Sequence, residues 1–447
     1  MTREMKNSGV EWIGDIPSEW EIEKTSRICN TITDYVASGS FASLSENVKY
    51  LDEPNYAMLI RTADVSNKGY NSKPVYVDEH AYNFLRNSNL YGGELLLPNI
   101  GGVGEVYIVP KLYEKMTLAP NAIIIRTDYC DKYYYYYFCS DAGFMSIKEI
   151  SQSTAQPKFN KTDFRQIKVL LPPLQEQKKI ADFLDSKVRE IDKIIFETKA
   201  SIENYKEYKQ SVITEAVTKG LDKNVPMKDS GIEWIGKIPC EWKVCKLKFF
   251  SKMISKGTTP KDMRTEIDHK YCVRYLKSEN IVSNDLRLEP EFSITKDINE
   301  ELKRSQLEIN DILFVIAGAS IGKTAIVPEE FLPANTNQAV SFIRLEKEFL
   351  DYKKYVWYFL QSRIIPTVIA LYSVQSAQPN LSMENLGNIK LAISKNKLEI
   401  FKIVDYLDAK NAEIDNLISK KEKLITNLEE YKKSLIYEYV TGKKAVE

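Results

Sequence analysis

The sequence predicts an α/β (α+β) protein built as two tandem pseudo-repeats, in which each globular domain is followed by one long helix and the two helices pair as an antiparallel coiled coil. Three observations lead to this fold class. An opening motif recurs after 222 residues, short β-rich runs fill the first part of each repeat, and a long heptad-spaced segment without internal glycine or proline ends each repeat.

The duplication is the clearest feature of the chain. Met5 to Ile22 reads MKNSGVEWIGDIPSEWEI, and Met227 to Val244 reads MKDSGIEWIGKIPCEWKV. This period is far above the roughly 20–50 residues of solenoid repeats, so it indicates a duplicated module of domain size. A molecule with two copies of a binding site is suited to a partner that also offers two binding sites.

Composition limits the function classes. The chain has 447 residues, 43% of them apolar, and 62 basic residues balance 62 acidic ones. A net charge of zero argues against coating nucleic acid by gross charge, although local basic faces remain open. No signal-like or membrane-spanning apolar run is expected. The six cysteines do not recur at equivalent positions, so we expect reduced thiols of a cytoplasmic protein and no bound metal.

The globular parts are expected at 1–172 and 223–393. Turn residues separate their short β-rich runs, which is typical of α/β or α+β domains. Strands are predicted at 122–126, 311–316 and 340–345. Short helices are predicted at 132–140 and 350–361.

The helical parts are expected at 173–222 and 394–447, with Gly220 and Gly442 ending the helices. Steps of four and three residues follow an apolar seam, which favours a coiled coil. Polar residues interrupt the two seams at matching places and could fix the register. The seam positions are Leu184, Val188, Ile191, Ile195, Thr198, Ile202, Tyr205, Lys209, Val212 and Ala216, and Leu407, Asn411, Ile414, Ile418, Lys421, Ile425, Leu428, Lys432, Leu435 and Tyr439.

Two packings of these helices are open at this point. Each helix could pack on its own domain, or the two could pair with each other. Pairing would be antiparallel, because two equivalent units related by a pseudo-twofold axis make an isologous contact. The seam from Leu184 to Ala216 would then span ~48 Å, which is about 14 base-pair steps of duplex DNA.

These features resemble the specificity subunits of type I restriction–modification enzymes over nearly the whole length. The resemblance rests on the paired SGxEWIGxIPxEW openings, on LPPLQEQKKIADFLD at the start of the first long helix, and on the domain–helix–domain–helix order. The start of the second helix, Ala392 to Glu399, lacks the Pro-Pro and Gln-Glu-Gln residues of the first, so docking contacts there are in doubt.

The resemblance implies a function for each part. Each globular domain would be a target-recognition domain that reads half of a bipartite asymmetric site in double-stranded DNA. The helices would set the spacer and dock two modification (methyltransferase) subunits, and two restriction (motor-nuclease) subunits can join them. This chain would bind no cofactor itself, while the methyltransferase partners would carry S-adenosylmethionine and methylate adenine.

One candidate DNA-binding site is a glycine-rich loop in each repeat. Residues 317–324 read AGASIGKT, which satisfies a permissive phosphate-loop pattern, but a β-branched run and Pro328 follow where a helix is needed. The equivalent residues 100–106 contain no lysine. Either a plain hairpin turn or a loop that presents amides and a lysine to DNA would explain these glycines. The candidates are Gly101, Gly102, Ser320, Lys323 and Thr324.

A second candidate is the polar loop at 151–160 and its counterpart at 373–380. Gln and Asn can pair with an adenine edge, and Ser can contact a base or a phosphate. A solvated linker explains the composition equally well. The candidates are Gln152, Ser153, Gln156, Lys158, Asn160, Gln375, Ser376, Gln378 and Asn380.

A third candidate is Arg61-Thr62 with its counterpart Lys277-Ser278. A basic residue beside a hydroxyl at a strand end suits phosphate binding, and a surface ion pair is the alternative. The aromatic run from Tyr133 to Phe138 is expected in the core. The tryptophan pairs of the two openings are expected to fasten each domain to a long helix.

Catalysis by this chain is not expected, because its two histidines are not equivalent and no Asn/Asp-Pro-Pro-aromatic methyltransferase motif occurs. Two alternatives to the DNA-specificity function remain. One is a scaffold that joins two protein-binding domains through a helical rod, and the other is a nucleotide-driven enzyme that uses Lys323.

Overall fold

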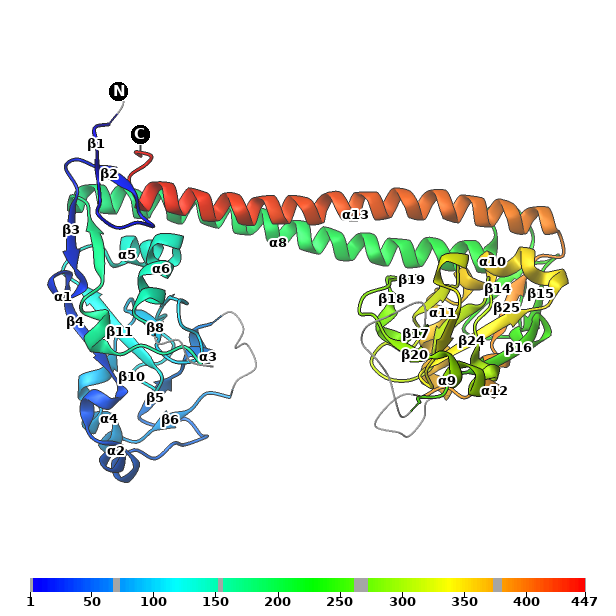
Figure 1. The fold of residues 1–447 in the computed structure, drawn as a ribbon, viewed down its shortest axis with the longest axis horizontal. Coiled ribbons are helices and arrows are strands. Elements are labelled where there is room, and N and C mark those ends of the chain that lie inside the picture. The colour runs from blue at the N-terminus through cyan, green and yellow to red at the C-terminus, as the bar shows by residue number, and fades with distance from the viewer. Residues whose placement is uncertain (1–2, 67–72, 152–155, 261–271, 373–379, 447) are drawn as a thin grey trace. The chain divides into compact units, whose positions relative to one another are not determined.

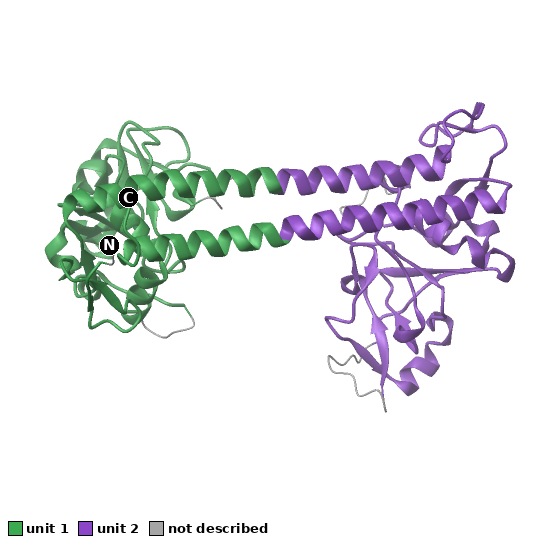
Figure 2. Ribbon diagram, turned by 90° about the horizontal axis from the view of Figure 1, so that it is seen from above, with its two compact units in different colours: residues 1–198, 423–447 green, residues 199–422 purple. Residues whose placement is uncertain are grey.

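The computed structural model describes residues 3–66, 73–151, 156–260, 272–372 and 380–446. Its contacts divide the chain into unit 1, residues 1–198 with 423–447, and unit 2, residues 199–422 (Figure 2). Each unit therefore holds one globular domain and parts of both long helices. The expected four parts, with boundaries at 172, 222 and 393, follow the order of the elements along the chain. The two compact units instead divide each long helix, because the start of one helix packs against the end of the other within each unit.

The long helices are α8 (Leu174–Lys219) and α13 (Lys397–Val440) (Figure 1). Their bounds agree closely with the prediction. Gly220 and Gly442 follow them with φ of 75° and 71°, a conformation that glycine adopts without strain. Strands β12 (Lys168–Leu171) and β25 (Lys390–Ile393) precede them.

The two helices pair along the predicted seam, so the alternative in which each packs only on its own domain is wrong. None of the predicted seam residues is exposed. In unit 1 the ring of Phe183 lies 4.5 Å from that of Tyr439, and Lys432 Nζ donates to Asp192 at 2.6 Å. In unit 2 Lys209 Nζ donates to Asp415 at 2.7 Å, which is the equivalent ion pair.

In unit 1 a four-stranded sheet has the order β4-β11-β8-β9 and a second has the order β6-β5-β10-β7. The run Ala122–Thr127 forms the central strand β11 because its β-branched residues are buried on both faces. The remaining elements of this unit are β1 (Met5–Asn7), β2 (Asp15–Pro17), β3 (Glu21–Lys24), α1 (Thr25–Ile28), β4 (Cys29–Asp34), α2 (Phe41–Asn47), β5 (Ala57–Ile60), α3 (Thr62–Val65), β6 (Tyr76–Val77), α4 (Glu79–Phe84), β7 (Asn89–Leu90), β8 (Leu95–Pro98), β9 (Tyr107–Ile108), β10 (Met116–Leu118), α5 (Asp131–Cys139), α6 (Asp141–Glu149) and α7 (Lys161–Phe164).

Unit 2 repeats this plan with the sheet orders β16-β24-β21-β22 and β20-β17-β23. In both units one core cluster joins the domain to residues of both long helices. The predicted α/β class is confirmed. The remaining elements are β13 (Met227–Asp229), β14 (Lys237–Pro239), β15 (Lys243–Lys246), η3 (Leu247–Phe249), β16 (Ser251–Lys256), β17 (Cys272–Leu276), β18 (Ile281–Val282), β19 (Asp285–Leu286), β20 (Ser293–Thr295), α9 (Lys296–Glu301), β21 (Ile312–Val315), β22 (Thr324–Ile326), β23 (Ala334–Thr336), β24 (Val340–Leu345), α10 (Lys353–Phe359), α11 (Ile364–Tyr372) and α12 (Met383–Gly387).

Candidate nucleic-acid interface

The glycine-rich loops are turns between antiparallel strands. In unit 2 the loop joins β21 to β22, and in unit 1 it joins β8 to β9. Gly318 and Gly322 have φ of 85° and 90°, and Gly101 and Gly104 have 81° and 95°, so each turn needs glycine at two matched places. A strand and not a helix follows Lys323, so these loops lack the helix N-terminus of a phosphate loop. The prediction of a tight turn is confirmed.

The polar loops lie against these hairpins in both units. Ile100 forms an isolated bridge with Lys158, and Ala317 forms the equivalent bridge with Asn380. A Cβ added at Gly101 would lie 3.5 Å from Nε2 of Gln156. Two of the three predicted candidate segments are therefore brought together, and the same pairing occurs twice.

The candidates on these loops differ in their exposure. Gly101, Gln156, Lys158, Lys323 and Asn380 are exposed, while Gly102 and Ser320 are half-buried. Gln152, Ser153, Gln375, Ser376 and Gln378 lie outside the described residues.

Two candidates have roles within the fold. Thr324 is fully buried and its hydroxyl donates to the carbonyl of Leu313 at 2.6 Å, so this side chain has a role within the fold and its DNA contact stays a prediction. The neighbouring residue in a strand points to the opposite face, which explains why Lys323 is exposed while Thr324 is not. Asn160 is exposed and caps α7, where its Oδ1 accepts from the backbone N–H of Asp163 at 2.9 Å. Its contact with DNA stays a prediction.

The third candidate segment forms the same turn in both units. The backbone N–H of Arg61 donates to Asp64 at 2.8 Å, and that of Lys277 donates to Asn280 at 2.9 Å. In unit 1 the guanidinium of Arg61 also forms two hydrogen bonds with Asp64, at 3.0 and 2.7 Å. These bonds raise the pKa of Arg61. The ion-pair alternative thus accounts for Arg61, whose DNA contact remains a prediction.

In unit 2 the amide of Asn280 replaces the carboxylate. The Nζ atom of Lys277 instead lies 3.5 Å from the centroid of the Phe292 ring. Ser278 Oγ donates to Glu279 at 2.9 Å. This lysine therefore lies against an aromatic face, and no carboxylate occupies the place of Asp64, although Glu279 keeps the formal charge of the turn at zero as in unit 1.

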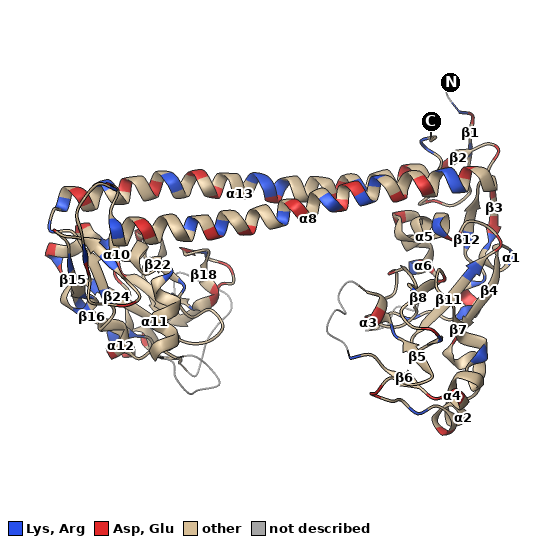
Figure 3. Ribbon diagram, turned by 180° about the vertical axis from the view of Figure 1, so that it is seen from behind, with Lys and Arg blue, Asp and Glu red and all other residues tan. Residues whose placement is uncertain are grey.

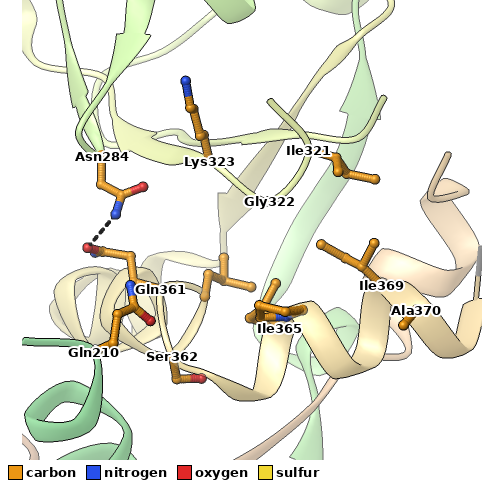
Figure 4. Close-up of a pocket in the computed structure, with 12 residues that line it drawn as sticks. Gln210, Asn284, Ile321, Gly322, Lys323, Gln361, Ser362, Ile365, Ile369 and Ala370 are labelled. Carbon is orange, nitrogen blue, oxygen red and sulfur yellow. Dashed lines mark hydrogen bonds between the residues drawn. The ribbon is translucent and has the colours of Figure 1, made fainter. Parts of the chain in front are cut away.

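Each unit has a cavity beside its glycine hairpin; the lining of the unit 1 cavity includes the third candidate segment, whereas that of the unit 2 cavity does not among the described residues. In unit 1, Arg61 and Thr62 share a cavity of about 470 Å³ with Ile100 and Asn121, which places the third candidate beside the hairpin. In unit 2 a cavity of about 510 Å³ opens between the hairpin and α11 (Figure 4).

The unit 2 cavity is one feature that sequence reasoning missed. Gly322, Ile365 and Ile369 line its apolar side. In unit 1 the ring of Phe144 fills the equivalent place, because a Cβ at Gly104 would lie 2.5 Å from it. Pro366 stands where the 222-residue offset places Phe144. That substitution of an aromatic by a proline was the available signal.

The second tryptophan of each opening fastens its domain to a long helix, as predicted, whereas the indole of Trp12 donates to Ser146 of its own domain. Trp20 Nε1 donates to Glu176 in the first turn of α8 at 2.9 Å, and Trp242 Nε1 donates to Glu399 in the first turn of α13 at 3.1 Å. The second helix therefore keeps this docking carboxylate although its opening residues depart from the family pattern.

The aromatic run is core, as predicted, and it also docks the domains. Tyr133, Tyr134, Tyr136, Tyr137 and Phe138 are buried. In unit 1 the hydroxyl of Tyr133 donates to Val440 at the end of α13 at 2.8 Å. In unit 2 the hydroxyl of Tyr355 donates to Val217 in the last turn of α8 at 3.0 Å. Each domain therefore contacts the start of one long helix and the end of the other.

No group of three or more potential metal ligands occurs among the described residues. All six cysteines are free thiols. Within the same described parts, the helices lack the combination of length and apolar character that a membrane span requires.

Two domains that each present a glycine hairpin beside a polar loop, fastened to paired helices, define a protein with duplicated recognition domains. Residues 17–204 and 239–425 both match the type I restriction modification DNA specificity domain, and the chain belongs to this family. It is therefore a non-catalytic DNA specificity subunit of a type I restriction–modification system, with two recognition domains in tandem.

Three known proteins illustrate the similarity. The chain is 28% identical over 306 residues to the type I restriction enzyme MjaVIII specificity subunit of Methanocaldococcus jannaschii, covering 66% of this chain and 67% of that protein. It is 25% identical over 451 residues to the proposed MjaX specificity subunit of the same organism, covering 96% and 95%. A solved chain from work on complex assembly and conformational transition of the type I R-M system matches with a TM-score of 0.70 at 12% identity, covering 96% and 99%.

Proposed function

We propose that each domain reads one half of a bipartite asymmetric DNA site through its glycine hairpin and the polar loop beside it. The observation that carries this proposal is the repeated bridge between the two loops, Ile100 with Lys158 and Ala317 with Asn380. Exposed lysine and amide side chains at such a junction suit contacts with phosphates and base edges.

The paired helices would set the spacer between the half-sites and dock two modification subunits, one for each repeat. Those partners would bind S-adenosylmethionine and methylate adenine, and two restriction subunits can join the complex. Each domain is held to the start of a long helix by the same contact, Trp20 with Glu176 and Trp242 with Glu399. This duplication supports two equivalent partner sites. With zero net charge, affinity would come from the assembled complex, and this chain would supply selectivity.

A domain exchange tests the reading function. The opening residues contact both long helices in unit 1, because Trp20 donates to Glu176 of α8 and Tyr437 of α13 donates to backbone carbonyls of the opening. The exchange should therefore replace residues 25–167 by those of another recognition domain and retain residues 1–24. Sequencing of methylated adenines in a host that carries the complete system should show one changed half-site, with the other half-site and the spacer unchanged. The matched exchange of residues 247–389 should change only the other half, and a hybrid that alters both halves would contradict the proposal.

An insertion tests the spacer function. One heptad inserted into α8 after Ile195, with one inserted at the equivalent place in α13 after Ile418, keeps the seam in phase while adding about 10 Å to the helix pair. The methylated site should gain spacer length and keep both half-sites. Changed half-sites at a constant spacer would refute a ruler role.

The scaffold alternative makes a different prediction. A complex of this chain with its methyltransferase partner should bind duplex DNA with an affinity that falls as salt rises. A scaffold without nucleic-acid contacts would show no such binding.

A further inference from the structure

Unit 2 carries a lysine-rich surface that unit 1 lacks. Residues 243–256 read KVCKLKFFSKMISK, with five lysines and no carboxylate. The equivalent residues 21–34 of the first repeat read EIEKTSRICNTITD, with two basic residues and three carboxylates. The same fold element is therefore strongly basic in one repeat and slightly acidic in the other.

These lysines share one region of the unit. They belong to β15, η3 and β16. Blue segments lie in the region of the β15 and β16 labels in Figure 3. Lys248 Cβ and Ile254 Cδ1 would lie 3.4 and 3.3 Å from a Cβ on Gly387 of α12. Alternate residues of a regular strand share a face, so Lys256 lies on the same face as Ile254. Lys252 lies at a β-bulge between Ser251 and Met253 and is exposed on the same strand. We name Lys248, Lys252 and Lys256 the β16 lysine strip.

The charges of the strip are available to a ligand. Lys248, Lys252 and Lys256 are all exposed. Among the described residues, no ion pair involves them. In unit 1 the position equivalent to Lys256 is Asp34, which is buried and pairs with Lys161 at 2.8 Å. The neighbouring exposed carboxylates are those of Glu241, Glu346 and Glu384, and the strip together with Lys243, Lys246 and Lys390 outnumbers them.

A second pair of lysines extends this surface. Lys246 and Lys390 are directly opposite each other in the antiparallel pair of β15 and β25. Like charges directly opposite are destabilising, so a bound anion would relieve this repulsion. In unit 1 the equivalent Lys24 is likewise directly opposite a lysine, Lys168, but it donates to Gln166 at 2.8 Å, which gives its ammonium a polar partner within the fold.

The strip is separate from the candidate reading site. Strand β16 is at one edge of the sheet β16-β24-β21-β22, and the hairpin with Lys323 is at the other. Lys252 and Lys256 are spaced by roughly 13 Å along the strand, a distance over which a duplex backbone presents several phosphates. Lysines also protect exposed sheet edges from pairing with other chains, so the experiment must separate these two roles.

We infer that the β16 lysine strip binds the phosphate backbone of duplex DNA outside the half-site that this domain reads. The inference rests on the proposed DNA-reading function and adds a second, sequence-independent contact to unit 2 alone. The contact would add affinity and salt dependence without changing which bases are read, because phosphates carry no direct sequence information.

The test uses the assembled complex with its methyltransferase partner and a labelled duplex of arbitrary sequence and about 40 base pairs, long enough to carry flanking phosphates. Lys248→Glu, Lys252→Glu and Lys256→Glu are combined in one variant. Glutamate keeps the sheet edge charged, so edge protection is retained while phosphate attraction is lost. Fluorescence anisotropy over a range of KCl concentrations should show weaker binding and a salt slope reduced by about 0.9 for each lysine that contacts a phosphate.

The matched control reverses three exposed lysines on other elements of unit 2, Lys223→Glu, Lys237→Glu and Lys296→Glu, with the same change in net charge. It should keep the slope of the wild-type complex. If the charge-reversed strip does not fold, the corresponding Lys→Gln triple variant, checked by thermal unfolding, should show the same loss of slope. Wild-type binding by the strip variant, or an equal loss in the control, would overturn the inference alone. A wild-type complex that binds no duplex would overturn the proposed function and the inference together.

Discussion

The hydroxyl of Tyr355 joins the recognition domain of unit 2 to the end of α8, and its removal tests how the domain is held. Tyr355 is fully buried, and its single hydroxyl hydrogen is shared between the carbonyls of Val217 at 3.0 Å and Ala392 at 2.6 Å. The last four carbonyls of a helix have no partner within the helix, and this hydroxyl supplies one for Val217. Burial raises the pKa of Tyr355 well above its ordinary value, so the hydroxyl remains a donor.

Tyr355→Phe should lower the free energy of unfolding of unit 2 by about 1–3 kcal/mol, because a buried carbonyl loses its donor while packing is retained. Tyr133→Phe should cost less, because the equivalent hydroxyl contacts one carbonyl, that of Val440, among the described residues. Urea denaturation of the full chain gives the stability change. Amide hydrogen exchange in the last turn of α8 shows whether the loss is local, which matters because a two-unit chain need not unfold in one step.

Tyr208→Phe is the matched control on the same helix. Its side chain is 49% exposed, so its removal should change stability by less than about 0.5 kcal/mol. If Tyr355→Phe proves as stable as the control and exchange at the end of α8 is unchanged, the hydroxyl does not fasten the domain to the helix.

Two further predictions concern charge. Lys432→Asp should lower the stability of the helix pair of unit 1 by up to about 1 kcal/mol, and adding Asp192→Lys should restore that stability. A double-mutant cycle that shows no coupling energy between the two positions would exclude a role for this ion pair in the register. Glu94 is buried, which opposes its ionisation, but hydrogen bonds from Arg126 and from backbone amides lower its pKa below 4.5. Because the pKa of Glu94 is depressed in the folded state, the wild type should be more stable than Glu94→Gln above pH 4.5, and this advantage should shrink as the pH falls below 4.5. Urea denaturation midpoints that keep a constant difference between the two proteins down to about pH 3 would contradict this.

The candidate site could be predicted only in part. The loops were recognised because glycine and polar residues recur at matching places in both repeats. Their contact with each other was not predictable, because the bridge from Ile100 to Lys158 joins segments that are distant in sequence. The burial of Thr324 depends on which face of β22 points into the core. In a short strand next to a turn, the sequence does not determine which of the alternating residues face the core.

The sequence by itself determined the duplication, the bounds of the long helices and the seam by which they pair. Periodicity and helix-ending glycines are local signals, and local signals are readable without coordinates. Only the tertiary structure decided that each compact unit takes parts of both helices, since this depends on antiparallel packing between segments more than 200 residues apart. It also decided that Lys256 is exposed on an edge strand while its counterpart Asp34 is buried and paired with Lys161, because this ion pair forms between residues that only folding brings together.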